Sequence, residues 1–423
     1  MKLVSLDTAL DAIQSGMRIW VQGMASTPHQ LLEGLAERCQ TLQDVTLLHL
    51  HLEGETPWVK PDLVDRVRDI SLFVGPNLRD AVNAGLSDYL PIFLSEVPLF
   101  LEDSEFRPDV ALINVSPPDR HGFVSLGPTI EATLKAIQVA PLTIAQVNPK
   151  VPRVLGDAQI HMDSITYGVE VDEALNANPV LAPDPLSLTI GRQVAALIPD
   201  RAVLQLGIGR IPDAVLSQLT HHRDLGIHSE MISDGVRLLA EQGVISGRYK
   251  GTDPGFIVAT FAMGSDALYQ FLDDNPGVLM RPVDYTNNTS VIRRNPRMIS
   301  INSAIEVDLT GQVVAESIGP RIVSGVGGQM DFVRGASLAP GGRSIIALPS
   351  RTRAGRPRIV ADIQAGAAVT TTRNHVQYVV TEYGVAELHG RTLAQRAHQL
   401  IAVAHPDDRE ELARYAKTRL PRF

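Results

Sequence analysis

Short apolar runs alternate with amphipathic segments along most of the chain. The apolar runs are typical of buried strands, and segments with apolar residues three or four positions apart are typical of helices. The early part predicts strands over 18–22, 45–52, 109–115 and 142–147, and helices over 28–38 and 130–140. The pattern resumes with strands over 202–206, 256–261 and 344–348 and a helix over 212–219. This alternation predicts βαβ units and an α/β fold with mostly parallel sheets.

Two features divide the chain. At 423 residues it exceeds what one hydrophobic core usually organises, and three prolines fall within residues 179–185, where Asp184 and Pro185 resemble a capped helix start. We therefore predict domains over 1–183 and 184–423. Their similarity is suggested by four residues that recur 184 positions later: Gly23, Pro28, Leu32 and Leu35 correspond to Gly207, Pro212, Leu216 and Leu219. The predicted fold is two similar open α/β domains.

Composition excludes several classes of protein. A net charge of -9 gives no basic surface for nucleic acid, and no apolar run approaches the ~18 residues of a membrane span. Asp7 and Asp11 follow the first residues closely, so no signal peptide is expected and we predict a soluble, cytoplasmic protein. Cys39 is the only cysteine, which favours a packed thiol over a disulfide. The histidines lack the spacing of a metal site, so no metal is expected.

Glu230 is the first candidate for chemistry. It lies in the apolar, strand-like run 226–235, which opens onto a turn. Burying an unpaired carboxylate costs several kcal/mol or raises its pKa, so an ordinary strand avoids one. Glu316, Glu382 and Glu387 are the other acids to weigh against it, each of which also fits a helix or strand edge.

Two glycine-rich segments are candidates for ligand binding. The turn Gln205-Leu206-Gly207-Ile208-Gly209 joins a predicted strand to a predicted helix, but it lacks the third glycine of a dinucleotide fingerprint and fits a structural turn equally well. The loop 324–332 holds Gly325, Gly327 and Gly328, whose amides could face a ligand or an oxyanion. A tight turn or β-bulge is the alternative for this loop.

Polar residues in the last third supply further candidates. Asn302 ends a predicted strand and could donate its side-chain amide to an oxyanion. Four arginines between residues 351 and 358 could hold phosphates or could line a solvated loop. The chain has no Gly-x-Ser-x-Gly elbow, so a serine hydrolase is poorly supported.

Several motifs carry a resemblance that covers nearly the whole chain. The motifs are Gly75 to Arg79, Asp109 to Gly127, Gly226 to Gly235, Gly325 to Phe332, Thr381 to Val385 and His405 to Arg409. Taken in this order, they resemble the acetyl-CoA hydrolase/transferase family, and within it the 4-hydroxybutyrate CoA-transferases.

The resemblance implies a class I CoA-transferase with two related α/β domains. It assigns the catalytic glutamate to Glu230 and the oxyanion contacts to Asn302 and Gly327. The CoA-contacting loop falls on residues 205–209, and a further CoA contact falls on Ser350 or Arg351. We also expect Gly325 and Gly328 of the second glycine loop to bind CoA.

The implied chemistry is covalent. Glu230 would attack an acyl-CoA thioester, and a glutamyl-CoA thioester would carry the CoA to a second carboxylate, so CoA is a substrate and no cofactor is expected. The expected partners are acyl-CoA, short-chain carboxylates and further copies of this chain in a homodimer or higher assembly, without nucleic acid or membrane.

Two alternatives use the same fold. A short-chain acyl-CoA hydrolase would resolve the Glu230 intermediate with water, and a catalytically silent sensor would bind acyl-CoA without forming an adduct. Arg210, Arg351 and Arg353 depart from the family's pattern. Arg210 could pair with a carboxylate substrate or a CoA phosphate, or could face solvent.

Overall fold

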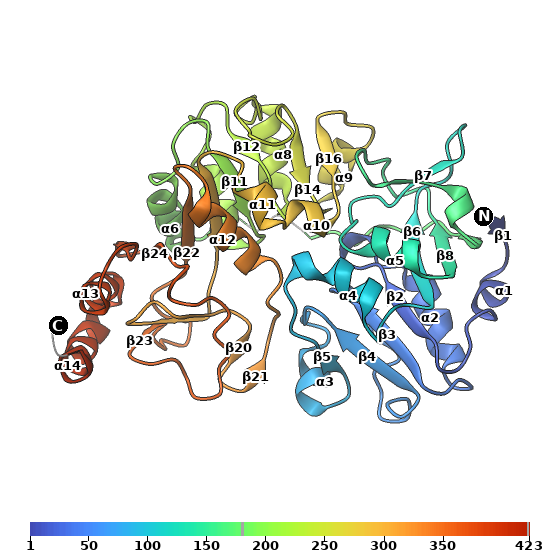
Figure 1. Cartoon of the computed structure of the whole chain (residues 1–423), viewed down its shortest axis with the longest axis horizontal. Helices are drawn as coiled ribbons and strands as arrows, with labels where there is room; N and C mark the ends of the chain where they lie inside the picture. The colour runs from blue at the N-terminus through green and yellow to red at the C-terminus, as the bar shows by residue number, and fades with distance from the viewer. Residues whose placement is uncertain (179–181, 421–422) are drawn as a thin grey trace. The chain divides into compact units, whose positions relative to one another are not determined.

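The computed structural model describes residues 1–178, 182–420 and 423, which form two compact units (Figure 1). Unit 1 consists of Met1–Pro179, Val258–Thr286 and Ile322–Gly327, and unit 2 of Val180–Ile257, Asn287–Arg321 and Gly328–Phe423. The two-unit division therefore differs from a single boundary at residue 183. The predicted linker 179–185 falls partly outside the described residues, since 179–181 are not among them.

Backbone hydrogen bonds explain why later segments belong to unit 1. Ile130 donates to the Thr260 carbonyl at 2.9 Å, and Asp157 donates to the Met280 carbonyl at 2.8 Å. The segment 322–327 is attached through a side chain, because the Val326 amide donates to the Tyr89 hydroxyl at 3.1 Å. Unit 1 is therefore completed by chain that lies far along the sequence.

Unit 1 contains an eight-stranded parallel sheet in the order β1-β10-β8-β6-β2-β3-β4-β5. Every residue of its central strand β6 is buried, as expected for a parallel sheet covered on both faces. The strands are β1 Lys2–Leu3, β2 Arg18–Val21, β3 Val45–His49, β4 Val67–Ser71, β5 Asp88–Tyr89, β6 Val110–Val115, β8 Leu142–Val147 and β10 Tyr167–Glu170.

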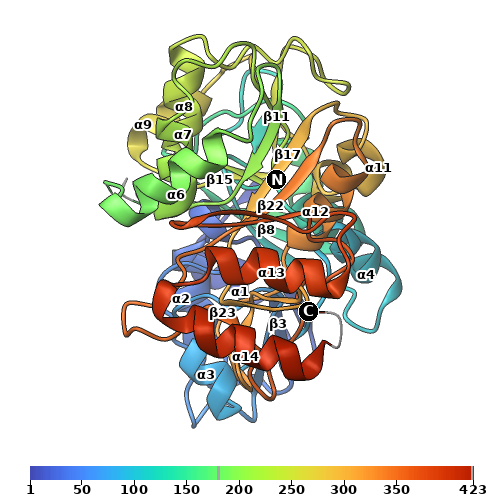
Figure 2. The ribbon, with the colours of Figure 1, turned by 90° about the vertical axis from the view of Figure 1, so that its left-hand side faces the viewer.

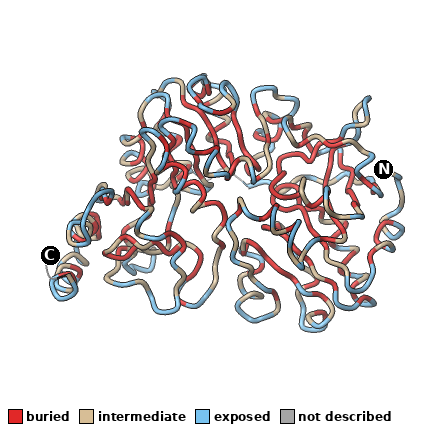
Figure 3. Tube along the Cα trace, in the orientation of Figure 1, coloured by how far each residue is buried: buried red, intermediate tan, exposed pale blue. Residues whose placement is uncertain are grey.

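Unit 2 contains a six-stranded sheet in the order β12-β11-β17-β22-β24-β25, parallel except for the final antiparallel pair. Its strands are also mainly buried (Figure 3). They are β11 Val203–Leu206, β12 Gly226–Ile227, β17 Met298–Asn302, β22 Arg343–Ala347, β24 Tyr378–Thr381 and β25 Gly384–Glu387.

The two sheets share one strand order. Five neighbouring strands of each sheet follow one another in space in the same chain order. They are β3-β2-β6-β8-β10 in unit 1 and β12-β11-β17-β22-β24 in unit 2. The repeated residues fall on equivalent elements, because Gly23 follows β2 and Gly207 follows β11, each before a helix. The prediction of two similar, mostly parallel α/β domains is confirmed.

Helices cover the sheets, and in unit 2 α13 and α14 lie side by side (Figure 2). Their buried residues Leu400 and Leu412 share a hydrophobic cluster with Val379 of β24. Unit 1 holds α1 Leu6–Leu10, α2 His29–Arg38, α3 Arg79–Ala84, α4 Val97–Asp103, α5 Thr133–Val139, α9 Asp266–Leu272 and α10 Val283–Thr286. Unit 2 holds α6 Pro185–Ala195, α7 Arg210–Ser217, α8 Asp234–Glu241, α11 Thr289–Ile292, α12 Gln329–Leu338, α13 Leu393–Val403 and α14 Arg409–Arg419.

Shorter elements complete the chain. The strands are β7 Phe123–Ser125, β9 Gln159–His161, β13 Met231–Ile232, β14 Ile257–Ala259, β15 Phe261–Ala262, β16 Val278–Met280, β18 Glu306–Asp308, β19 Val313–Val314, β20 Ser317–Ile318, β21 Arg321–Ile322 and β23 Ile359–Val360. The short 3-10 helices are η1 Met24–Ser26, η2 Leu94–Glu96, η3 Met162–Ser164 and η4 Pro406–Asp408.

Local predictions hold with three adjustments, of which the first is that the predicted strand 45–52 ends at His49. The predicted strand 256–261 is broken at Thr260, whose carbonyl and hydroxyl accept hydrogen bonds from residues 130 and 131. The predicted helix 130–140 begins only at Thr133, after Glu131 adopts a positive φ of 48°. Cys39 is buried at the end of α2, and burial raises the pKa of its thiol to about 11, so it is a packed side chain.

Candidate active site

Glu230 lies in a gap between two short strands. Strand β12 ends at Ile227, and β13 begins at Met231. The Ser229 hydroxyl donates to the Leu206 carbonyl at 3.2 Å. In a longer strand pair, a backbone N–H would make this hydrogen bond. The expectation that Glu230 sits within a strand is therefore wrong, because the chain leaves the sheet before reaching it.

Two donors hold the Glu230 carboxylate. Asn287 donates from Nδ2 to Oε2 at 2.9 Å, and the backbone N–H of Gly328 also hydrogen-bonds the carboxylate. Only a glycine fits at position 328, because an added Cβ would lie 1.8 Å from Oε2 of Glu230 and 2.1 Å from Nδ2 of Asn287. The glycine thus lets backbone approach the acid at hydrogen-bonding distance.

These donors offset the cost of burial only in part. Burial is the largest influence and raises the pKa of Glu230 from 4.5 to about 7, with the charge of Asp331 adding to the rise. The hydrogen bonds from Asn287 and Gly328 favour the charged form and limit the increase. The fold therefore makes the Glu230 carboxylate unusually basic.

The strand order gathers the predicted site residues of unit 2 at one sheet edge. The carboxyl ends of β12, β11, β17 and β22 lead to Glu230, the 205–209 turn, Asn302 and Ser350 respectively. Between β11 and β17 the sheet order reverses, since β12 lies on one side of β11 and the later strand β17 on the other. Open α/β sheets bind ligands at such a switch point, at the carboxyl ends of their strands.

The glycine turn forms part of this edge. Gln205 and Leu206 are buried at the end of β11, whereas Ile208 is 39% exposed. Gly209 has a φ of 110° and is followed at once by α7, so only a residue without a Cβ readily joins the strand to the helix. Arg210 pairs with Asp184 at 3.1 Å, so its guanidinium already has a carboxylate partner within unit 2.

Asn302 belongs to a polar cluster beside this turn. Its Nδ2 donates to the Ser300 hydroxyl at 2.8 Å and lies 3.2 Å from Oε1 of Gln205. The Ser300 hydroxyl in turn donates to the same Gln205 oxygen at 2.7 Å. These bonds fix the Asn302 amide at the end of β17, and its role as an oxyanion donor stays a prediction.

Ser350 and Arg351 are also engaged. The Ser350 amide and hydroxyl donate to Glu382 at 2.9 and 2.6 Å. The Arg351 guanidinium binds Asp408 at 2.5 Å and Asp407 at 3.3 Å, which clamps the loop after β22 to η4. A contact between Arg351 and CoA would compete with these two carboxylates, and this assignment stays a prediction.

The second glycine loop is divided between the units. Gly325 and Gly327 belong to unit 1, where an added Cβ on either would press on the Phe73 ring, and the Gly327 carbonyl accepts a hydrogen bond from Leu94 at 3.1 Å. Gly328 belongs to unit 2 and opens α12. Of the three glycines, Gly328 is the one that the structure brings to Glu230.

The other candidate carboxylates have structural partners. Glu316 is buried and accepts a hydrogen bond from Thr370, Glu382 holds Ser350, and Glu387 lies exposed on β25 near Arg391. Glu230 remains the candidate for chemistry, because Asn287 and Gly328 hold its carboxylate and burial raises its pKa to about 7.

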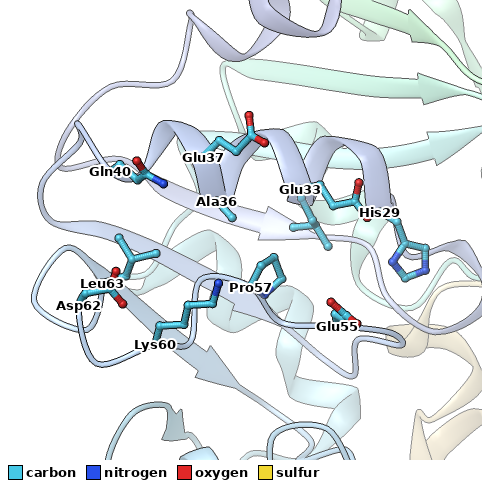
Figure 4. Close-up of a pocket in the computed structure, with 11 residues that line it drawn as sticks. His29, Glu33, Ala36, Glu37, Gln40, Glu55, Pro57, Lys60, Asp62 and Leu63 are labelled. Carbon is cyan, nitrogen blue, oxygen red and sulfur yellow. The ribbon is translucent and has the colours of Figure 1, made fainter.

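A pocket of about 440 Å³ lies in unit 1 between α2 and residues 55–63 (Figure 4). Its polar lining is mainly acidic, with one lysine, Lys60. None of the predicted site residues lines this pocket.

Asn287 and Asp331 are the two partners of Glu230 that sequence reasoning missed. Asn287 lies 57 positions from Glu230 and follows a short helix without any motif. Asp331 offered a signal, because it is an acid three residues after Gly328 in the glycine-rich motif.

Comparison with known proteins agrees with this arrangement. The N-terminal domain model of the acetyl-CoA hydrolase/transferase family matches residues 1–178, and its C-terminal domain model matches residues 264–416. A 4-hydroxybutyrate coenzyme A transferase of Clostridium kluyveri is 46% identical over 99% of this chain and 98% of its own length. A succinyl-CoA:acetate/propanoyl-CoA:succinate CoA transferase of Fasciola hepatica is 46% identical over 98% of this chain and 87% of its own length.

Solved structures agree as well. The crystal structure of a 4-hydroxybutyrate CoA-transferase from Porphyromonas gingivalis superposes with a TM-score of 0.86 at 37% identity, covering 99% of this chain and 98% of that one. No helix among the described residues has the length and apolar character to cross a membrane. Full-length matches in sequence and structure place this chain in the acetyl-CoA hydrolase/transferase family.

Proposed function

We propose that this protein is an acyl-CoA:carboxylate CoA-transferase that uses Glu230 as its covalent nucleophile. The observation that carries the proposal is the Glu230 carboxylate, which is held by Asn287 and Gly328 and has a pKa raised to about 7. Higher basicity strengthens a carboxylate as a nucleophile, and backbone and amide donors keep it aimed. The names of the two transferase relatives support the same class of reaction.

The reaction exchanges one thioester for another of similar free energy. An oxygen of ionised Glu230 attacks the acyl-CoA carbonyl, the C–S bond breaks, and a mixed anhydride and CoA thiolate result. The thiolate attacks the glutamyl carbonyl and expels the acyl group as a free carboxylate, which leaves a glutamyl-CoA thioester. A second carboxylate then runs both steps backwards and leaves with the CoA.

The donors on Glu230 fit the charge that develops. When thiolate attacks the glutamyl carbonyl, negative charge gathers on a former carboxylate oxygen, and Oε2 already faces Asn287 and Gly328. A prepositioned donor of this kind is worth about 3 kcal/mol to a transition state. We assign these two donors to the glutamyl oxyanion and retain Asn302 and Gly327 as predicted donors for the acyl oxyanion.

The relatives point to small acids as substrates. The names of these relatives include 4-hydroxybutyrate, succinate, acetate and propanoyl-CoA, so we propose short-chain carboxylates and their CoA thioesters as substrates of this chain. A homodimer or higher assembly, a cytoplasmic location and the absence of a cofactor are part of the same proposal.

Product analysis tests the activity. Acetyl-CoA is incubated with 4-hydroxybutyrate, succinate, propanoate or butyrate, and the acyl-CoA products are identified by mass spectrometry. We expect at least one new acyl-CoA with matching release of acetate. Release of free CoA without a new thioester would reject transfer in favour of hydrolysis.

Trapping the intermediate tests the mechanism. After exposure to acyl-CoA without an acceptor, borohydride reduction should convert the Glu230 thioester to an alcohol that peptide mapping locates. Glu230→Gln should abolish the adduct and lower kcat on the order of 10³-fold or more. Glu387→Gln, an exposed site on β25, is the matched control and should retain both. Turnover without modification at Glu230 would reject the covalent mechanism.

A further inference from the structure

Asp331 is a second carboxylate close to Glu230. It is 6% exposed, lies in the first turn of α12, and is three residues from Gly328, whose amide hydrogen-bonds Glu230. Nδ2 of Asn287 is 3.4 Å from Oδ2 of Asp331 and 2.9 Å from Oε2 of Glu230. One amide nitrogen therefore faces two carboxylates that lie 101 positions apart in the sequence.

We propose that Asp331 is a positioning residue for Glu230 and acts through the carboxamide of Asn287. The inference rests on the proposed function, since it assigns a role in the same reaction.

The orientation of an amide gives Asp331 its effect. An asparagine side chain has two N–H donors on nitrogen and an oxygen that only accepts. With a carboxylate on each side, both hydrogens of Asn287 have an acceptor, whereas the flipped amide would turn its oxygen toward two negative groups. Asp331 thus fixes the amino end on Oε2 of Glu230, where the glutamyl oxyanion forms.

The negative charge of Asp331 also makes Glu230 more basic and therefore a stronger nucleophile. This charge raises the pKa of Glu230, as burial does to a larger extent. The hydrogen bonds from Asn287 and Gly328 lower the pKa. The neighbouring titratable side chain His228 is buried, with its ring 6.3 Å from that of Phe332 on α12. Glu230 therefore titrates near two other titratable side chains, Asp331 and His228.

A more basic Glu230 also influences which of the two carbonyls of the mixed anhydride the thiolate attacks. Thiolate attack at either carbonyl expels the other carboxylate, and the less basic one leaves more readily. An ordinary short-chain acid has a pKa near that of a free glutamate, about 4.3. Because Glu230 is more basic than the substrate acid, the substrate carboxylate leaves and the CoA stays on the enzyme. Asp331 therefore favours capture of the CoA by Glu230 in the first half-reaction, whereas the transfer to the acceptor, in which Glu230 is the leaving group, carries the opposite bias.

A titration that does not depend on turnover tests the charge. Glutamate labelled with ¹³C at the side-chain carboxyl reports the ionisation of Glu230, and its signal is assigned by its loss in Glu230→Gln. Asp331→Asn keeps an acceptor oxygen but removes the charge, so the midpoint of Glu230 should move to lower pH than in the wild-type protein. An unchanged midpoint would overturn the proposal, even if CoA transfer is confirmed.

Kinetics test the positioning. We expect Asp331→Ala to lower kcat on the order of a hundredfold, because an error of ~1 Å in a reacting group costs about that much, and Asp331→Asn to restore part of the loss. The acid limb of the kcat profile should lie at lower pH in Asp331→Asn. Wild-type kcat in both variants would overturn the proposal. If the wild-type protein transfers no CoA, the proposed function fails and the titration still decides the role of Asp331.

Asp308→Asn controls for general loosening. Asp308 is another buried carboxylate of unit 2, and its Oδ1 accepts hydrogen bonds from the Thr310 and Gln312 amides, both at 2.9 Å. Its loss should lower the Tm while the Glu230 midpoint and kcat stay at their wild-type values. A shift of the midpoint equal to that of Asp331→Asn would show an indirect effect and overturn the proposal.

Discussion

Replacing Glu230 by glutamine should stabilise the folded protein, but only above pH 4.5. The fold raises the pKa of Glu230 from 4.5 to about 7, so ionisation is less favourable in the folded state than in the unfolded chain. A tenfold change in proton affinity is about 1.4 kcal/mol, and the shift therefore corresponds to about 3 kcal/mol at most. The favourable contribution of a protonated Glu230 is complete below pH 4.5 and is lost as pH rises to about 7. Glutamine has nearly the same shape and cannot ionise.

Urea unfolding of both proteins between pH 4.5 and 8.5 measures this difference. Near pH 4.5 the two should have almost equal free energies of unfolding. Above pH 7 Glu230→Gln should be more stable by up to about 3 kcal/mol, although it has lost its nucleophile. Glu387→Gln, the same substitution at an exposed site on β25, is the control and should leave the free energy of unfolding near its wild-type value. A stability difference that does not change with pH would refute the conclusion that the fold raises the pKa of Glu230.

Three further substitutions test the surroundings of Glu230. Gly328→Ala should abolish covalent modification of Glu230 by acyl-CoA, measured by peptide mapping, since the added Cβ would overlap Oε2 of Glu230. Gly277→Ala is the control, because its Cβ would meet only the side chain of Asn275 at 3.2 Å, and it should leave the modification intact. Asn287→Ala should move the acid limb of the kcat profile to higher pH, because a hydrogen bond that favours the ionised acid is lost. Ser229→Ala should lower the free energy of unfolding by about 1 kcal/mol in urea titration, since it leaves the Leu206 carbonyl without the hydroxyl donor.

Much of the fold follows from local pattern. Buried parallel strands are continuous apolar runs, so β6 and β8 are predicted within a residue of their bounds. The repeat of Gly23 as Gly207 marks equivalent strand-turn-helix units. The division into units escapes such reasoning, because the membership of residues 258–286 depends on long-range hydrogen bonds such as that between residues 130 and 260.

The candidate site was predictable only in its reactive group. Glu230 stands out because an acid in an apolar run demands a reason, and Gly328 belongs to a visible glycine motif. Asn287 carries no local signal, since its meaning lies in a contact made across 57 positions of sequence. The gap in which Glu230 lies was missed because a side-chain hydrogen bond from Ser229, rather than a turn residue, ends the strand pairing.

The discontinuous make-up of unit 1 has a consequence for synthesis on the ribosome. Residues 1–178 hold its whole sheet, yet the segments 258–286 and 322–327 complete it. At about 5–20 residues per second, the last of these emerges roughly 7–30 s after the first segment. During that interval the first segment of unit 1 lacks the hydrogen-bond partners that the later segments supply, so chaperones have a defined period in which to act. Separating the chain at residue 183 would make that incomplete state permanent.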